Sequence, residues 1–159
     1  MSAQVTTHEM GFEPLDSLPG LDSLCVFVGE DDRPLRGAAG FLDWRLCGSL
    51  SRVLVSGFFV GAPGDTLLLP TLGRIAIPRV FAVGVGRTQA LTDETLAAAL
   101  LNAAQVLRKA RVEAVALELP GAGVLQDSGR AQAFKGAFLP VFTGARVAVL
   151  GEKGLGKIL

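Results

Sequence analysis

The stretch that most constrains this sequence runs from Arg79 to Leu119 and reads as a strand, a turn, a long amphipathic helix and a second strand. The two flanking runs, Val80 to Val85 and Ala114 to Leu119, are almost continuously apolar, which is typical of parallel strands covered on both faces. A helix between two such strands predicts a right-handed crossover that leaves the strands parallel. This unit therefore predicts an α/β fold.

The helix of this unit is expected over residues 92–110. Thr92 is its predicted N-cap, and Asp93 and Glu94 in the first turn complement the positive end of the helix dipole. Residues three or four positions apart form one stripe toward the core: Leu96, Leu100, Ala104, Leu107 and Arg111. This is the most strongly specified helix of the chain.

The rest of the chain adds strands and helices whose order predicts a three-layer α/β/α domain with a mixed, mostly parallel sheet. Strands are expected over residues 24–28, 66–69 and 146–150, with short ones around 9–12 and 73–78. Helices are expected over residues 37–54 and from Asp127 or Ser128 to Pro140. Residues 1–23 otherwise read as irregular and residues 151–159 as a flexible tail, so residues 1–159 are expected to form a single domain.

Composition and charge favour a globular, cytoplasmic protein. Half of the residues are apolar, and mean hydropathy is +0.46. The net charge is zero, which gives no drive toward nucleic acid or an anionic membrane. Residues 1–50 carry eight acids and three bases, and residues 51–159 seven acids and twelve bases, so head-to-tail association and a merely solvated surface both remain open. No signal peptide is visible, and the longest apolar helical stretch, Leu96 to Leu107, is too short to span a bilayer.

Two glycine turns are the weak candidates for a ligand site. Gly84 and Gly86 follow one predicted strand, and Gly121 and Gly123 follow the next. Both turns are expected at the carboxyl ends of strands, where α/β proteins bind ligands. However, Gln89 stands where a dinucleotide motif needs its third glycine, so a tight strand exit is the favoured interpretation.

No catalytic residue, metal site or cofactor is predicted. His8 is the only histidine, in a segment expected to be mobile, and Cys25 and Cys47 form no CxxC or metal spacing. Both cysteines are expected to be small buried hydrophobes. Asp31 and Asp32 read as a solvated turn.

The C-terminal residues 151–157 match the first part of a phosphate-binding P-loop. Ile158 stands where the motif needs a Ser or Thr hydroxyl for Mg²⁺, so a frayed tail is preferred over a nucleotide site.

Three runs in fixed order carry a family resemblance: Pro34 to Leu54, Phe58 to Pro70 and Arg79 to Leu96. They contain Phe-Val-Gly-Ala-Pro-Gly-Asp-Thr at residues 59–66 and Val-Gly-Val-Gly at residues 83–86. Over residues 24–119 the chain resembles the N-terminal domain of the leucine (cytosol) aminopeptidase family.

The resemblance implies a macro-like fold and a role in assembly rather than hydrolysis. In that family the two-metal site belongs to a separate C-terminal domain, whose Asn-Thr-Asp-Ala-Glu-Gly-Arg signature does not occur here. The expected protein is therefore not an enzyme but a stand-alone domain that forms homo-oligomers or binds a related aminopeptidase. The alternative is a small-ligand module, since macro domains bind ADP-ribose, although Gly37 to Gly40 imitates only one of their phosphate loops and does so loosely.

Overall fold

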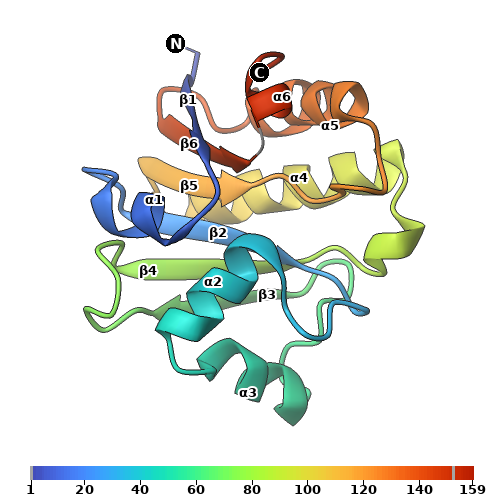
Figure 1. The fold of residues 1–159 in the computed structure, drawn as a ribbon. Coiled ribbons are helices and arrows are strands. Elements are labelled where there is room, and N and C mark those ends of the chain that lie inside the picture. The colour runs from blue at the N-terminus through green and yellow to red at the C-terminus, as the bar shows by residue number, and fades with distance from the viewer. Residues whose placement is uncertain (1, 152) are drawn as a thin grey trace.

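The computed structural model describes residues 2–151 and 153–159, and it contains one six-stranded sheet in the order β1-β6-β5-β2-β4-β3 (Figure 1). The strands are β1 (Gln4–Glu9), β2 (Ser23–Val28), β3 (Thr66–Pro70), β4 (Arg79–Gly84), β5 (Ala114–Glu118) and β6 (Arg146–Gly151). Each pairs in parallel with its neighbours except β3, which is antiparallel to β4. The mixed, mostly parallel sheet is thus confirmed.

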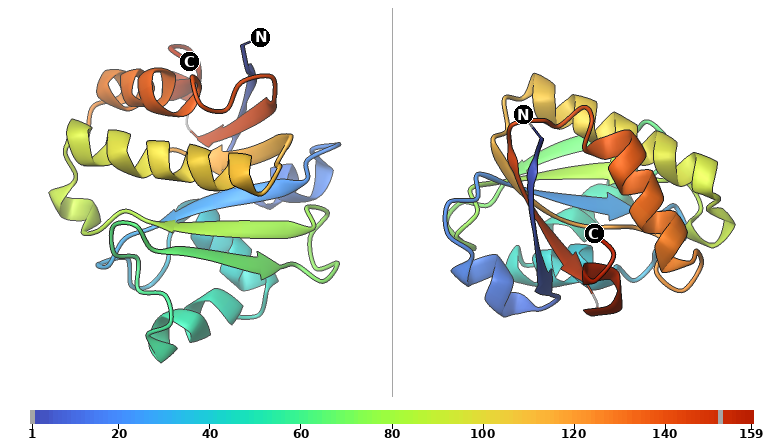
Figure 2. Two further views of the ribbon diagram at one scale, coloured as in Figure 1. Left: turned by 180° about the vertical axis from the view of Figure 1, so that it is seen from behind. Right: turned by 90° about the horizontal axis from the view of Figure 1, so that it is seen from above.

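Helices cover both faces of the sheet and give the predicted three layers (Figure 2). One face carries α1 (Phe12–Ser17), α2 (Gly37–Arg45) and α3 (Ser49–Ser56). The other carries α4 (Asp93–Lys109), α5 (Asp127–Ala133) with a π-helical continuation (Phe134–Phe138), and α6 (Lys153–Gly156); a 3-10 turn, η1 (Thr88–Ala90), precedes α4. Two apolar clusters, one on each face, form the core. No helix among the described residues is long and apolar enough to cross a membrane.

Helix α4 confirms the central prediction. Thr92 caps it through a reciprocal capping box with Thr95, which satisfies backbone N–H groups of the first turn. The apolar members of the predicted stripe, 96, 100, 104 and 107, are fully buried against the sheet. Arg111 does not belong to the stripe: it lies past the helix end in a left-handed conformation (φ 59°) and is exposed.

The single helix expected over residues 37–54 is wrong, because the chain breaks into α2 and α3. Cys47 (φ 54°) and Gly48 (φ 80°) are both left-handed, which no helix interior accommodates. The Asp43 carboxylate then accepts hydrogen bonds from the N–H groups of Leu50 (2.9 Å) and Ser51 (3.1 Å), so it satisfies the first turn of α3. The break is therefore built by a contact between the two helices.

The two cysteines have different environments, and only one fits its prediction. Cys25 is fully buried in β2, and burial raises the pKa of its thiol to about 12. Cys47 is exposed at the helix break, with its Sγ 3.0 Å from the Arg74 guanidinium. The prediction that Cys47 is buried is therefore wrong.

Both ends of the chain are more ordered than the sequence suggested. The N-terminal strand covers Gln4–Glu9 rather than 9–12, so His8 lies in a strand and not in a mobile segment. Residues 151–159 include α6, and Leu155 is 2% exposed within the core, which differs from the predicted flexible tail. Helix α5 begins after Gln126 without a side-chain cap, so neither Asp127 nor Ser128 is its N-cap.

Residues 73–78 form bends and no strand, contrary to the hairpin prediction. Thr71 closes this loop, because its N–H donates to Pro78 O (3.0 Å) and its buried hydroxyl donates to Ile77 O (2.5 Å). These bonds satisfy backbone groups that a strand would have paired across a ladder.

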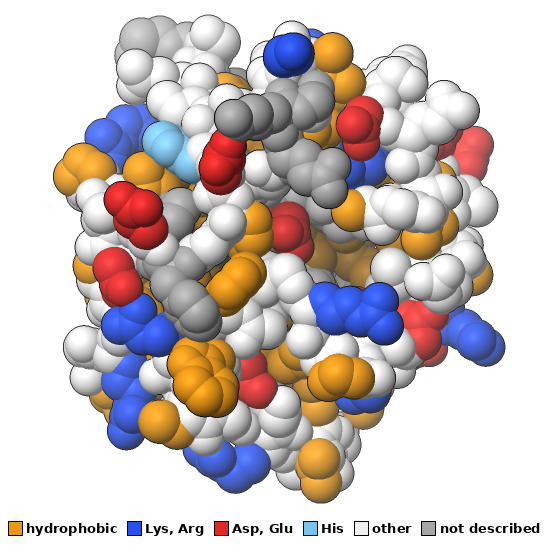
Figure 3. Space-filling model, viewed as in Figure 1, with side chains coloured by type: hydrophobic (Ala, Val, Ile, Leu, Met, Phe, Trp, Pro, Cys, Tyr) orange, Lys and Arg blue, Asp and Glu red, His pale blue; other side chains and the backbone are white. Residues whose placement is uncertain are grey.

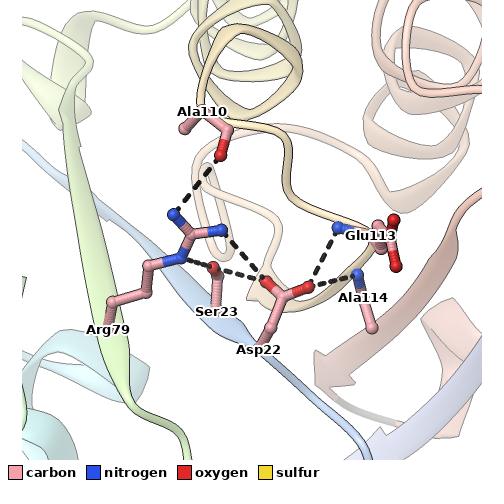
Figure 4. Close-up of polar contacts among 6 residues, drawn as sticks. All are labelled: Asp22, Ser23, Arg79, Ala110, Glu113 and Ala114. Atoms are coloured by element: carbon pink, nitrogen blue, oxygen red, sulfur yellow. Dashed lines mark hydrogen bonds and ion pairs between the residues drawn. The ribbon is translucent and has the colours of Figure 1, made fainter.

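A polar network fastens the amino ends of three strands (Figure 4). The Asp22 carboxylate accepts from the N–H groups of Glu113 (2.9 Å) and Ala114 (3.1 Å) at the start of β5 and pairs with Arg79 Nη2 at 3.6 Å. Arg79 Nε donates to the fully buried Ser23 Oγ at 2.8 Å. Because β2, β4 and β5 are held together at their amino ends, their carboxyl ends are aligned at the opposite end of the sheet.

Candidate functional site

The carboxyl ends of β2, β4 and β5 and the loops that follow them form the candidate site. As predicted, all four candidate glycines lie at this edge: Gly84 ends β4, and Gly86 (φ 76°), Gly121 (φ 93°) and Gly123 (φ 78°) occupy turns after β4 and β5. The positive φ values explain why glycine is used at the last three positions.

Gly84 is required by a close approach of two backbone segments. A Cβ on Gly84 would lie 2.1 Å from Ala62 O and 2.6 Å from the carbonyl carbon of Gly61. The approaching loop is tied down by a hydrogen bond from Gly86 N to Gly61 O (2.9 Å). The first glycine turn is therefore a tight strand exit whose backbone groups are engaged within the protein.

The second glycine turn is held by a buried arginine. Arg130 is 6% exposed and donates to Leu119 O (2.6 Å) and to Pro120 O (3.1 Å), just before the turn. The N–H groups of Val124 and Leu125 both donate to Gly121 O. Sequence reasoning missed Arg130, because a single arginine in an amphipathic helix gives no sign of the loop that it holds.

The two turns do not line the same cavity. The loops that contain them share a small apolar cluster, in which Val124 and Leu125 pack against Val85, Leu91 and Ala99. A cavity of about 380 Å³ is lined by Gly84 and Gly86 but by neither Gly121 nor Gly123. The other residues around this cavity are Glu30, Pro63, Gly64, Val85, Arg87, Ala90, Thr95, Ala98, Ala99 and Asn102.

Asp31 and Asp32 are not the solvated turn that the sequence suggested. Asp31 accepts from the N–H groups of Thr88 (2.7 Å) and Gln89 (3.1 Å), and Asp32 accepts from Gly29 N (2.8 Å). Burial works to raise the pKa of Asp31, but these backbone hydrogen bonds and the charge of Arg87 outweigh it and lower that pKa. The acidic pair fastens the β2 exit to η1.

Glu118, at the end of β5, occupies the amino end of α2. Its Oε1 accepts from Ala38 N (3.3 Å), and a Cβ on Gly37 would lie only 2.2 Å from that oxygen. Burial raises the pKa of Glu118, against the opposing effects of the Ala38 N–H and Arg130. Sequence reasoning read this residue only as part of a strand; an acid that ends an apolar parallel strand was the signal that could have identified it.

Around the carboxyl ends of these strands, carboxylates of the chain itself thus accept the hydrogen bonds of backbone N–H groups. Asp65 repeats the pattern, with Oδ2 accepting from Val60 N and Ala62 N, each at 3.2 Å. An incoming phosphate would meet negative charge where an anion site needs free donors. Among the described residues, no three His, Cys, Asp or Glu side chains gather as a metal site. His8 contacts Thr6 Oγ1 on β1 (3.1 Å).

A second feature is a group of exposed apolar side chains between residues 44 and 72, here called the 44–72 surface. Of the eight large apolar side chains that are exposed among the described residues, five make up this surface: Trp44, Val55, Phe58, Val60 and Leu72. Leu68, in the same stretch of sequence, is exposed on the opposite face of β3. Figure 3 shows hydrophobic side chains beside basic ones over the lower part of the molecule, around α2 and α3. Arg45, Arg52 and Arg74 belong to the same part of the chain.

Comparison with known proteins gives both a family and a fold. Residues 25–140 match the N-terminal domain of the cytosol aminopeptidase family. A probable cytosol aminopeptidase of a Geobacter species is 40% identical over 83 residues, which are 52% of this chain and 17% of the relative. The chain spans about a fifth of the length of the curated relatives that it matches.

Two solved structures agree with this fold. A Trypanosoma brucei macrodomain in complex with ADP-ribose superposes with a TM-score of 0.75 at 12% identity, over 98% of this chain and 67% of that one. A tomato leucine aminopeptidase superposes with a TM-score of 0.64 at 17% identity, over 98% of this chain and 34% of that one. At such identities the likeness shows the macro-like fold alone.

Proposed function

Because this chain belongs to the cytosol aminopeptidase family, through that family's N-terminal domain, we propose that it is a non-catalytic association domain of the cytoplasm. It forms homo-oligomers or binds a related full-length aminopeptidase. The relatives carry about four-fifths of their length beyond the matched part, and the proposal assigns the hydrolytic chemistry to that remainder.

The 44–72 surface is the observation that carries this proposal. Phe58 is 81% exposed, and Trp44, Val55 and Leu72 are similarly open, within one stretch of sequence that contains α3 and β3. Scattered apolar side chains are ordinary on a protein surface, whereas a concentration of large ones beside polar residues is typical of protein–protein contacts. An aromatic anchor and arginines nearby are the residue types enriched in such contacts.

The charge of the surface indicates the kind of partner. Residues 44–74 contain Arg45, Arg52 and Arg74 and one acid, Asp65. Asp65 is engaged by backbone N–H groups of its own loop. A partner surface with apolar side chains at its centre and acids at its margin would complement this region.

Light scattering coupled to size exclusion tests the proposal directly. The chain is measured over a wide concentration range, alone and mixed with a full-length cytosol aminopeptidase such as the Geobacter relative. We expect a mass above the 16.5 kDa of one chain, or co-elution with the enzyme. A 16.5 kDa species at every concentration that also elutes apart from the enzyme would refute the association role.

A small-ligand module is the second candidate, and the cavity of about 380 Å³ beside Gly84 and Gly86 favours it. The carboxylates of Asp31 and Glu118 disfavour an anionic ligand such as ADP-ribose at the strand ends. Thermal shift with ADP-ribose and nucleotides at millimolar concentration decides between the candidates. A saturable stabilisation would support the ligand module, and no shift would exclude these ligands.

Residual peptidase activity is tested separately with an aminoacyl chromogenic substrate and added divalent metal. We expect no metal-dependent cleavage. Turnover that co-purifies with the chain and is abolished by a chelator would contradict the non-catalytic assignment.

A further inference from the structure

Strand β3 leaves one row of backbone groups unpaired. It is the last strand of the sheet, and Gly84 N donates to Asp65 O at 2.8 Å. Residues 65 and 84 therefore form a hydrogen-bonded pair. Along an antiparallel strand the direction of the backbone N–H and C=O groups alternates from residue to residue. The backbone groups of 67 and 69 thus point to β4, and those of 66, 68 and 70 point outward. Among the described residues, neither Thr66 nor Leu68 has a partner on that outer side.

The side chains of β3 do not protect this edge. The strand reads Thr-Leu-Leu-Leu-Pro and carries no charge, although proteins commonly protect free edges with charged residues. Leu67 and Leu69 pack against the apolar cluster that α2 and α3 share, while Leu68 points to the opposite face and is 55% exposed. Pro70 removes one N–H at the end of the strand and leaves its carbonyl as an acceptor.

We infer that β3 pairs antiparallel with the β3 of a second copy of this chain, about a two-fold axis at Leu68. This inference rests on the proposed association role and specifies its mode. Leu68 N–H donates to the second copy's Leu68 O and the reverse, and Thr66 N–H donates to the second copy's Pro70 O in both directions. The two sheets become one continuous sheet, with the two Leu68 side chains side by side on the same face.

The register is self-complementary, which is why a second copy fits better than an unrelated strand. Pro70, which has no N–H to offer, lies opposite Thr66, whose own N–H finds the Pro70 carbonyl. Each contact away from the axis occurs twice, once in each direction, as a two-fold interface requires. A register displaced by two residues would lose the pairing of one end of this five-residue strand.

The other edge of the sheet is less suited to such a pairing. The opposite edge strand, β1, has the polar sequence Gln-Val-Thr-Thr-His-Glu, so an equivalent pairing there would bury no large apolar side chain except Val5.

A disulfide test probes the register itself. In a Cys47→Ser background, Leu68→Cys places two thiols on residues that form a hydrogen-bonded pair, whose Cα atoms lie about 5.5 Å apart. That separation is within the range that a disulfide spans. We expect a covalent dimer under mild oxidation, seen on non-reducing gels and lost on reduction.

The matched control is Thr66→Cys in the same background. Thr66 lies on the same strand and face, but its symmetry mate is displaced by four residues, about 13 Å along the strand. We expect little or no covalent dimer from this variant. Equal crosslinking of the Thr66→Cys and Leu68→Cys proteins would indicate random collision and would overturn the inference.

A charge variant and hydrogen exchange complete the test. We expect Leu68→Lys to weaken self-association at least tenfold, and we expect the amides of 66 and 68 to exchange more slowly as wild-type concentration rises. If the wild type self-associates but Leu68→Lys leaves its mass unchanged, the β3 pairing is wrong and the association role stands. If the wild type is monomeric throughout, the pairing is wrong, and co-elution with the aminopeptidase decides the association role separately.

Discussion

Replacing Phe58 by Ser removes the most exposed aromatic side chain of the 44–72 surface. Phe58 is 81% exposed, so the free chain loses almost no packing when it is truncated. A phenylalanine buries about 150–250 Å² when fully covered. Covering the exposed part of this one, about 120–200 Å², is worth about 3–5 kcal/mol at about 25 cal/mol per Å². Because ordering and incomplete coverage reduce that value, we expect affinity for the partner to fall by about ten- to several hundred-fold.

The assay is a dissociation constant from sedimentation or mass photometry, for self-association or for the aminopeptidase, whichever the wild type shows. Urea unfolding of the same protein must agree with the wild type within about 0.5 kcal/mol, as expected for an exposed site. Leu101→Ser, at a 38% exposed position on α4, is the matched control and should leave the affinity unchanged. If Phe58→Ser binds within twofold of the wild type while it remains folded, the 44–72 surface is not the interface.

Three further changes test the structure beneath the surface. Asp22→Ala should lower the unfolding free energy by about 2 kcal/mol, because two N–H groups at the start of β5 lose a partly exposed charged acceptor. Urea unfolding measures this change, and a loss under about 0.5 kcal/mol would contradict the network of Figure 4. Burial raises the pKa of Glu118 above 4.5 in the folded state, so the wild type should lose stability as pH rises from 4.5 through that higher value. Glu118→Gln should lack this slope, and parallel curves of stability against pH would be the contrary result. Gly84→Ala should cost at least about 2 kcal/mol, since its Cβ would lie 2.1 Å from Ala62 O, whereas Gly136→Ala, where nothing lies within 4 Å, should be neutral or slightly stabilising by thermal denaturation.

The elements that the sequence predicted well are those whose signals are local. Helix α4 follows from its own periodicity and from the Thr92 cap, both contained in a few turns of chain. The break between α2 and α3 does not follow from a local signal, because a left-handed Cys47 has no sequence signature of its own. It depends on Asp43 reaching across the break to the first turn of α3. Strand β1 was misplaced for a related reason: its partner, β6, comes from the other end of the chain.

The candidate site also combines features that are visible in the local sequence with features that are not. The positions of the four glycines at strand ends could be predicted, because each pair follows an apolar run. The contacts of the surrounding carboxylates could not, because Glu118 contacts Ala38 across 80 positions of sequence and Asp31 contacts Thr88 across 57. A carboxylate that satisfies a distant backbone N–H leaves no pattern in its own segment. At Gly84 the close approach of Ala62 O gives a physical reason for the glycine that requires no ligand, whereas the carboxylates around these turns were not foreseen.

The pairing of β1 with β6 also sets the order in which the chain can mature. Gln4 is registered with Arg146 and Glu9 with Gly151, so β1 has to wait for β6, which is made much later (Figure 2). On a ribosome, the central strands and α4 can assemble while β1 remains without its partner. Contacts so distant in sequence slow folding, because the loop between them must close first. A nascent chain halted before β6 should therefore expose an unpaired β1, and the synthesis of β6 should be the event that completes this side of the sheet.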